Sequence, residues 1–229
     1  MLRKLLVVLM VLLVVVPVVE ARRRTASAGK IDNDVYTDSE YDFQLTIPDG
    51  WKPSVNKEDD HARLVLTQKK YDIPLDYINV PHYTWVPTLT VFVDTAEMNL
   101  HIFIDSLLTK EYESDTKKAI EKEFEFLSQQ EIIPKGRTRL EVAGESGVLW
   151  TAQAKYTKIV QTSASSVGGK RVYGNYGGAI AAVEHNGHMY MFFLMCEWNY
   201  FESIMAEASQ IIGSLTFPPE KEEGKKKDK

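Results

Sequence analysis

The chain has 229 residues, of which 44% are hydrophobic and 26% charged, with a net charge of −5 and one cysteine. This is enough chain for one globular domain with a filled core. A mildly acidic protein without a basic stripe is a poor nucleic-acid binder, which excludes nucleic acid as the expected partner. The single cysteine, Cys196, excludes an intramolecular disulfide and is interpreted as a buried, inert thiol.

The first 21 residues have the pattern of an export signal. Two basic residues precede an apolar run over 5–19, which at about 15 residues is shorter than the roughly 20 that a spanning helix needs. With the small residue Ala21, this pattern predicts a signal peptide over 1–21. Cleavage after Ala28 is a second possibility, and retention as an outward-facing membrane anchor is the alternative. We therefore expect an exported protein, periplasmic or secreted, that meets the membrane only if this segment stays uncleaved.

Two polar segments flank the predicted domain. Residues 22–35 are small, polar and charged, which predicts a flexible linker, and residues 218–229 predict a charged, disordered tail. One folded domain is therefore expected over 36–217. The acidic residues near its start lack the glycine and closing glutamate of a calcium loop, so they are interpreted as a solvated run: Asp32, Asp34, Asp38 and Glu40.

The first half of the domain predicts three strands followed by two helices. The strands show alternating apolar and polar residues, with Leu64 and Leu66 pointing inward in the second of them. The helices show apolar residues at helical spacing. The strands are expected over 41–47, 63–67 and 88–93, and the helices over 95–108 and 115–127.

The second half predicts two hairpins, a helix and a short last strand. Asn186-Gly187 lies between two apolar runs and predicts a tight hairpin, because a type I′ turn needs positive φ at both residues. Both faces of this hairpin are apolar, which favours a central place in a sheet covered on each side. Residues 161–178 are rich in glycine and serine and predict a flexible loop. The elements are expected over 137–142, 148–156, 179–185, 188–195, 201–212 and 214–217.

This order of elements predicts an α+β fold with a mainly antiparallel central sheet and helices on both faces, an α/β/α sandwich. Two local patterns accompany this order. The first is Tyr41-Asp42-Phe43 through Ile47-Pro48-Asp49-Gly50-Trp51. The second is the hairpin with Asn186-Gly187 and Tyr190, followed by a helix and Ser214-Leu215-Thr216-Phe217. With these two patterns, the order of elements resembles the PsbP-like fold. The resemblance implies an exported, non-enzymatic binding or assembly domain and carries over no partner.

The segment 69–87 is the predicted binding surface. Its three prolines rule out regular helix or sheet through most of its length. A long aromatic loop on a rigid scaffold is a common site of binding, here to a protein partner in the envelope or outside the cell. The alternative is that its rings fold back and close one end of the core. The candidate residues are Tyr71, Tyr77, His82, Tyr83 and Trp85.

Other chemistry is less well supported by the sequence. His185 and His188 should face each other beside the tight turn, with their Cβ atoms about 5 Å apart. A zinc site, however, needs a third protein ligand. They are kept as a candidate metal pair, with exposed turn histidines as the preferred interpretation, and no cofactor is predicted. A small-ligand or metal carrier, with its site under the 69–87 or 161–178 loop, is the alternative function. A hydrolase is the least favoured class, because no serine lies in a G-x-S-x-G motif and the two S-x-x-K matches, at Ser54 and Ser114, lack the accompanying S-D-N and K-T-G motifs.

Overall fold

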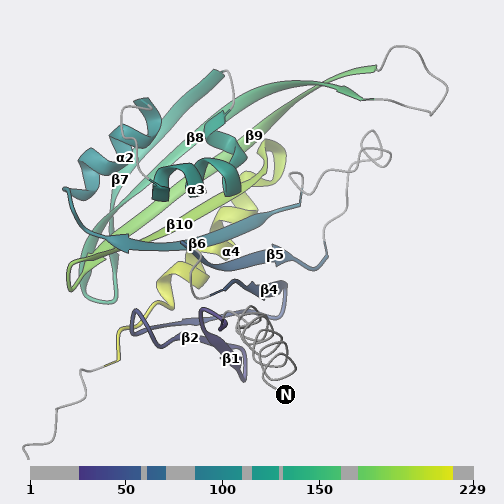
Figure 1. The fold of residues 1–229 in the computed structure, drawn as a ribbon. Coiled ribbons are helices and arrows are strands. Elements are labelled where there is room, and N and C mark those ends of the chain that lie inside the picture. Colours follow the sequence, from purple (N-terminus) through teal and green to yellow (C-terminus); the bar gives the residue numbers. More distant parts are fainter. Residues whose placement is uncertain are drawn as a thin grey trace, which may run out of the picture.

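The computed structural model describes residues 26–57, 61–70, 86–109, 115–128, 131–160 and 170–218. They form a three-stranded sheet of order β1-β2-β3 and a seven-stranded sheet of order β4-β5-β6-β10-β9-β8-β7, with every pair antiparallel (Figure 1). The predicted α+β class is confirmed. No helix among the described residues is long and apolar enough to cross a membrane. The predicted signal peptide and the tail beyond Pro218 lie outside the described residues.

The elements have the following bounds. The small sheet contains β1 (Lys30–Asp32), β2 (Val35–Asp38) and β3 (Phe43–Thr46). The large sheet contains β4 (Trp51–Val55), β5 (Ala62–Gln68), β6 (Thr88–Thr95), β7 (Glu131–Val142), β8 (Glu145–Val160), β9 (Lys170–His185) and β10 (His188–Glu197). The helices are α2 (Leu100–Thr109), α3 (Asp115–Glu123) and α4 (Phe201–Gly213), with short 3-10 turns η4 (Glu125–Ser128) and η5 (Trp198–Tyr200).

The β9–β10 hairpin forms as predicted. Asn186 and Gly187 have φ values of 48° and 75°, and His185 lies opposite His188 in the register. Both strands have a hydrogen-bonded neighbour on each side, because β8 pairs with β9 and β6 pairs with β10. The apolar character of both hairpin faces is thus explained by its central place in the sheet.

Two hydrophobic clusters cover the two faces of the large sheet. One cluster joins Tyr190, Phe192 and Leu194 of β10 to α4 and to the small sheet. The other joins Met189, Met191 and Phe193 of the same strand to α2, α3 and η4. Alternation along β10 therefore divides its side chains between two separate cores.

The large sheet has two distinct ends. At the hairpin end lie the tight turns Ala143-Gly144 and Asn186-Gly187. At the loop end the chain leaves β5 at Gln68 and enters β6 at Thr88, and η5 follows β10. Here the long β8–β9 ribbon projects beyond the other strands (Figure 1).

The predicted linker over 22–35 is wrong from its middle onward. Ala28 is buried, and β1 and the start of β2 fall within this range. The reason is a second tight turn, Asn33-Asp34, where both residues have positive φ, at 47° and 61°. Asparagine and aspartate tolerate this conformation better than other non-glycine residues, so the polar run folds into a hairpin.

The predicted flexible loop over 161–178 is wrong from residue 170, where β9 begins. Gly177 and Gly178 lie within the strand. A Cβ at Gly178 would lie 2.7 Å from the Phe126 ring, and one at Gly177 would collide with the Phe201 ring. These glycines therefore leave room for aromatic rings to pack directly on the backbone of the strand, a known role of glycine in sheets.

Other element boundaries also differ from the prediction. Residues 214–217 form a single bridge, Gln44 to Thr216, beside β3 and not a strand of the large sheet. The strand β7 starts at residue 131 and includes Pro134 next to a bulge, which is tolerated because β7 is an edge strand. The helix α2 starts at Leu100, where the His101 N–H donates to Asn99 Oδ1 at 3.0 Å.

Candidate functional site

The most buried charged groups join the two sheets. Arg63 of β5 is 1% exposed and Asp38 of β2 is fully buried. Arg63 Nε donates to Asp38 Oδ2 at 2.8 Å, and its Nη2 donates to Glu40 Oε2 at 2.6 Å and to the Ala28 carbonyl at 3.2 Å. Asp38 was predicted to lie in a solvated run, and this prediction is wrong.

A β-bulge explains how Arg63 reaches the small sheet. The register shifts between Ala62 and Leu64, which pair with neighbouring residues of β6. The inserted residue breaks the alternation of faces, so Arg63 is buried and reaches the small sheet, although strict alternation would place it on the face opposite to Leu64.

Asp38 is fully hydrogen-bonded. Its Oδ2 also accepts from the Tyr36 hydroxyl at 3.0 Å, and its Oδ1 accepts from the backbone N–H groups of Glu40 and Tyr41. Burial, followed by the negative charge of Asp38, raises the pKa of Tyr36. The guanidinium lies 4.7 Å above the centre of the Tyr41 ring. Because its groups satisfy one another, this cluster is a structural joint between the sheets.

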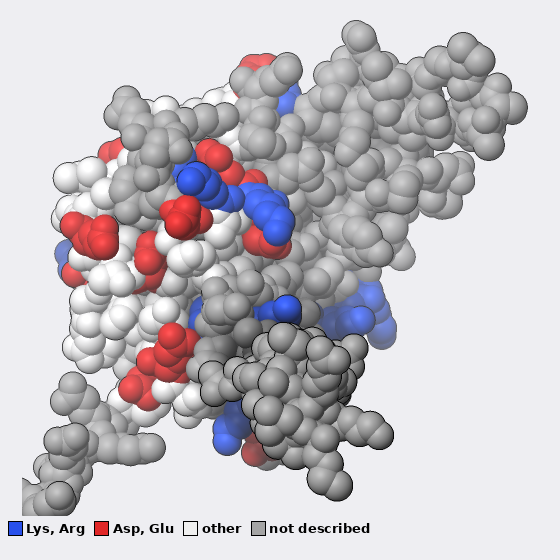
Figure 2. Space-filling view, in the orientation of Figure 1, with Lys and Arg blue, Asp and Glu red and all other residues white. Residues whose placement is uncertain are grey.

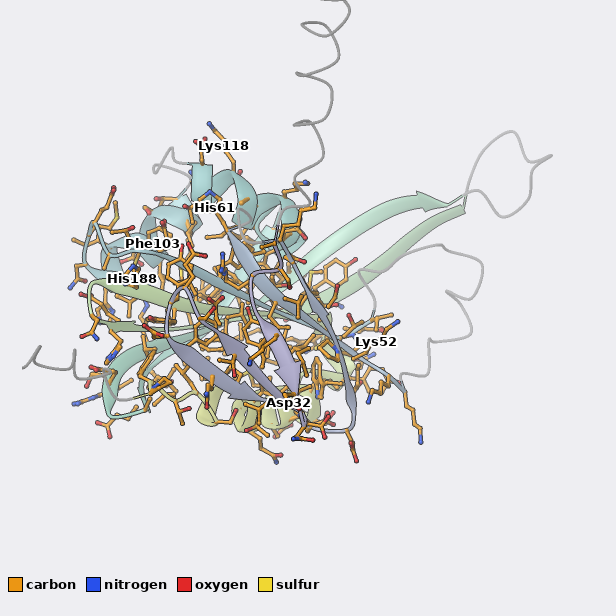
Figure 3. All side chains as sticks on the ribbon, turned by 60° about the horizontal axis from the view of Figure 1, so that its bottom comes forward. Asp32, Lys52, His61, Phe103, Lys118 and His188 are labelled. Atoms are coloured by element: carbon orange, nitrogen blue, oxygen red, sulfur yellow. The ribbon has the colours of Figure 1, made fainter. Side chains whose placement is uncertain are left out.

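The candidate metal pair, His185 and His188, is directed at different neighbours. His185 Nδ1–H donates to Glu145 Oε1 at 2.7 Å, and its ring stacks on Phe217 with centroids 3.8 Å apart. The His188 ring packs edge-on against Tyr41. In the part of the chain that the structure describes, no three potential metal ligands gather. His61 lies beside α3, apart from His188 in Figure 3, with Nδ1 3.3 Å from Thr116 Oγ1.

A cleft of about 460 Å³ lies at the hairpin end, between the start of α2 and strands β7 to β9. Its polar lining includes Arg137 and Arg139, which are bonded to Asp105 and Glu141 respectively. Among the described residues on the face shown in Figure 2, acidic and basic side chains are both present, and neither forms a continuous patch. The cleft lies at the opposite end of the sheet from Gln68 and Pro87, whereas a ligand site was predicted under the 69–87 or the 161–178 loop.

At the loop end the sheet holds both ends of the predicted binding segment together. The Gln68 N–H donates to the Pro87 carbonyl at 3.0 Å, and Thr67 lies opposite Thr88 in the ladder. The five predicted binding residues lie outside the described residues: Tyr71, Tyr77, His82, Tyr83 and Trp85.

Further aromatic side chains gather at the loop end. Trp198 stacks on Phe201 with ring centroids 5.3 Å apart, and Lys135 Nζ lies 5.2 Å from the Trp198 ring centre. Tyr200 is 42% exposed. The sequence did not single out these residues, because η5 interrupts both the strand and the helical periodicity. The signal was the presence of three aromatic residues within four positions, Trp198, Tyr200 and Phe201.

Cys196 is buried in the cluster beneath α4, as predicted. Burial, with a smaller effect of the Glu197 charge, raises the pKa of its thiol to about 12. The thiolate is the reactive form, so a pKa this high leaves the group inert near neutral pH.

No family model matches the chain, and the search of curated proteins finds no relative. The fold is similar to that of cyanobacterial PsbP (CyanoP) from Synechocystis sp. PCC 6803, at 10% identity over 82% of this chain and 98% of that one, with a TM-score of 0.48. It is also similar to LpqN, described as involved in cell envelope biogenesis of Mycobacterium tuberculosis, at 13% identity over 76% and 82% of the chains, with a TM-score of 0.42. One of these similar structures is a PsbP, the family that the sequence resembles. Similarity at this level carries over no residue role, partner or activity.

Proposed function

We propose that this chain is an exported, non-enzymatic binding domain, a PsbP-like sandwich with helices on both faces. It engages a protein partner in the envelope or outside the cell through the loop end of its large sheet. The observation that supports this proposal is the closed base of the 69–87 segment, where Gln68 and Pro87 are hydrogen-bonded neighbours.

A closed base matters because binding by a long loop costs conformational entropy. Pairing β5 with β6 fixes the two ends of the segment, and its prolines restrict the chain between them. Tyrosine and tryptophan bury a large area for few rotatable bonds. The exposed Tyr200 and the Trp198–Phe201 stack add aromatic surface at the same end.

The test is recovery of a defined partner by tagged full-length protein from its own cells. The wild type is expected to recover one protein in stoichiometric amount. The variant Y77A/Y83A/W85A should lose it, and Y200A should weaken it. The matched control is I102A. Ile102 is 60% exposed and lies on α2, away from the aromatic side chains of the loop end.

Retention of the partner by a folded Y77A/Y83A/W85A protein would overturn the assignment of this face. Recovery of the wild type without any partner would instead favour the second candidate, a small-ligand carrier. The cleft of about 460 Å³ supports that candidate, because its volume and converging polar groups are of the kind that small-molecule sites have.

A further inference from the structure

The two edges of the large sheet are built differently. The edge strand β4 has five residues with Pro53 in the middle, and the chain before β1 runs beside its end, where the Ala28 N–H donates to the Asn56 carbonyl. The opposite edge strand, β7, has twelve residues, and no strand of the described chain lies beyond it. An open edge strand is a template for pairing with another chain.

The hydrogen-bonding pattern of β7 can be read from its turn. Ala143 and Gly144 both have positive φ, at 54° and 83°, so they form a two-residue hairpin turn with Val142 and Glu145 as the flanking pair. Hydrogen-bonded pairs alternate along an antiparallel ladder. The N–H and C=O groups of the odd-numbered residues therefore point away from β8, to the open edge: Arg137, Arg139 and Glu141.

The regular part of β7 is short and bounded. It begins at Gly136, after the bulge beside Pro134, and ends at Val142, before the turn. Its centre is Arg139. Two copies that pair these segments antiparallel over their full length must therefore place Arg139 opposite Arg139 of the second copy, on a two-fold axis.

We propose that β7 pairs with β7 of a second copy in this register, which joins two seven-stranded sheets into one. Arg137 of each copy then lies opposite Glu141 of the other. The two central arginines are the only like-charged pair, and each is already bonded within its own chain, to Glu141 at 2.9 Å and to Ser146 Oγ at 2.9 Å. The three outward residues of each copy can form about six backbone hydrogen bonds across the axis.

Charge on an edge strand commonly prevents such pairing, but here both signs are present and are spaced symmetrically about the centre. Sliding the copies by two residues in one direction places Arg137 opposite Arg139, where like charges repel. Sliding them in the other direction keeps two Arg–Glu pairs, now Arg139 with Glu141, but shortens the overlap to Thr138–Val142 and leaves about four backbone hydrogen bonds. The proposed register is therefore the one that combines two Arg–Glu pairs with the longest overlap.

The other face of the same strand is apolar near the axis. Half-buried Leu140 lines a slot of about 150 Å³ with Leu149, Met205 and Ile212. In the proposed register Leu140 lies opposite Thr138 of the second copy, so the two Leu140 side chains are diagonal neighbours within reach of each other. Charged pairs on the α2 side and an apolar contact on the α4 side therefore favour the same occupant, a second copy of this chain.

Charge exchange tests the pairing. The full-length wild type is expected to have twice the mass of one chain by light scattering after gel filtration. R137E alone brings carboxylates together and E141R alone brings guanidinium groups together, so each should have the mass of one chain. An equimolar mixture of the two variants restores both opposite-charge pairs and should return to twice the mass. The proposal would be overturned if the wild type had the mass of one chain. It would also be overturned if R137E alone or E141R alone kept the mass of two chains.

A cysteine at the axis tests the register. Directly opposed residues in a hydrogen-bonded pair have Cα atoms about 5.5 Å apart, within the range of a disulfide. R139C should therefore give a covalent dimer under mild oxidation, since Cys196 is buried. The matched control R137C lies on the same edge and face, but its two copies would be about 13 Å apart and should not cross-link. Equal cross-linking of both variants, or none by R139C, contradicts this register. These variants leave the loop end untouched, so their outcome is independent of the partner experiment.

Discussion

The two faces of the large sheet are packed by different kinds of contact. The face beneath α2, α3 and η4 is packed with aromatic rings, such as Phe193, which contacts Phe92 edge-on and tilts against Phe124. The face beneath α4 and the small sheet adds a buried charged joint, Arg63 with Asp38. Apolar packing accepts many partners of similar size, whereas a buried ion pair accepts only its complement. The small sheet is thus held by apolar packing against β10 and α4 and, in addition, by one charged joint that is specific to its partners.

The largest expected effect comes from removing one partner of that joint. Asp38→Ala leaves the guanidinium of Arg63 buried without its carboxylate, which should cost about 3–5 kcal/mol of the free energy of unfolding. The measurement is urea unfolding followed by tryptophan fluorescence. Glu40→Ala is the matched control, because Glu40 is 45% exposed and its removal should cost under about 1 kcal/mol. Equal losses for the two variants would show that the joint does not hold the small sheet.

The next effect compares the two faces through neighbouring glycines. Gly178→Ala places a methyl group against Phe126 on one face, and Gly177→Ala places one against Phe201 on the other. Overpacking of this kind should cost about 1–3 kcal/mol in each case. Gly50→Ala, where no atom lies within 4 Å of the added carbon, is the control. Wild-type stability for Gly178→Ala would mean that the Phe126 ring can move aside.

What the sequence predicts well is local. Asn186-Gly187 fixes its hairpin within four residues, and the apolar spacing of α4 needs no knowledge of what the helix covers. The Asp38–Arg63 pair is different, because it joins residues 25 positions apart and depends on a bulge that alternation does not indicate.

The candidate site shows the same limit. Glycines in 161–178 were interpreted as a sign of flexibility, although two of them admit rings to the sheet. Whether a glycine serves a turn or a close contact depends on the opposing ring, which lies far away in sequence. The open edge of β7 could not be predicted either, because strand order follows from the whole topology.

A smaller effect concerns the pH dependence of a hydrogen bond beside this joint. The Tyr190 hydroxyl donates to the Tyr41 carbonyl at 2.8 Å, and burial, followed by the charges of Asp38 and Asp42, raises the Tyr190 pKa to about 12. Because this pKa is above the ordinary value of 10.0, the contribution to stability is complete below pH 10 and is lost between pH 10 and about 12.

Tyr190→Phe should therefore lower the free energy of unfolding by about 0.5–1.5 kcal/mol at pH 7. The difference in the free energy of unfolding between wild type and variant should narrow as pH rises through 10 to 12. Urea unfolding at a series of pH values measures this difference. Tyr200→Phe, at the exposed tyrosine of η5, is the control. Parallel stability curves for wild type and Tyr190→Phe would contradict this assignment.

The smallest expected effect is on the labelling of Cys196 by a thiol reagent, which should be slow in the native wild type. Cys196 shares its cluster with α4 and the small sheet, and burial raises its pKa to about 12. A thiol reagent at pH 8 should therefore label the native wild type only as fast as this face opens. Asp38→Ala should speed labelling if the small sheet helps to cover Cys196, whereas Gly178→Ala disturbs the other face first and should speed it less. Equal acceleration at equal loss of stability would mean that both faces open in one global event. Faster labelling of Asp38→Ala at matched stability would show that the small sheet can detach separately once its charged joint to β5 is broken.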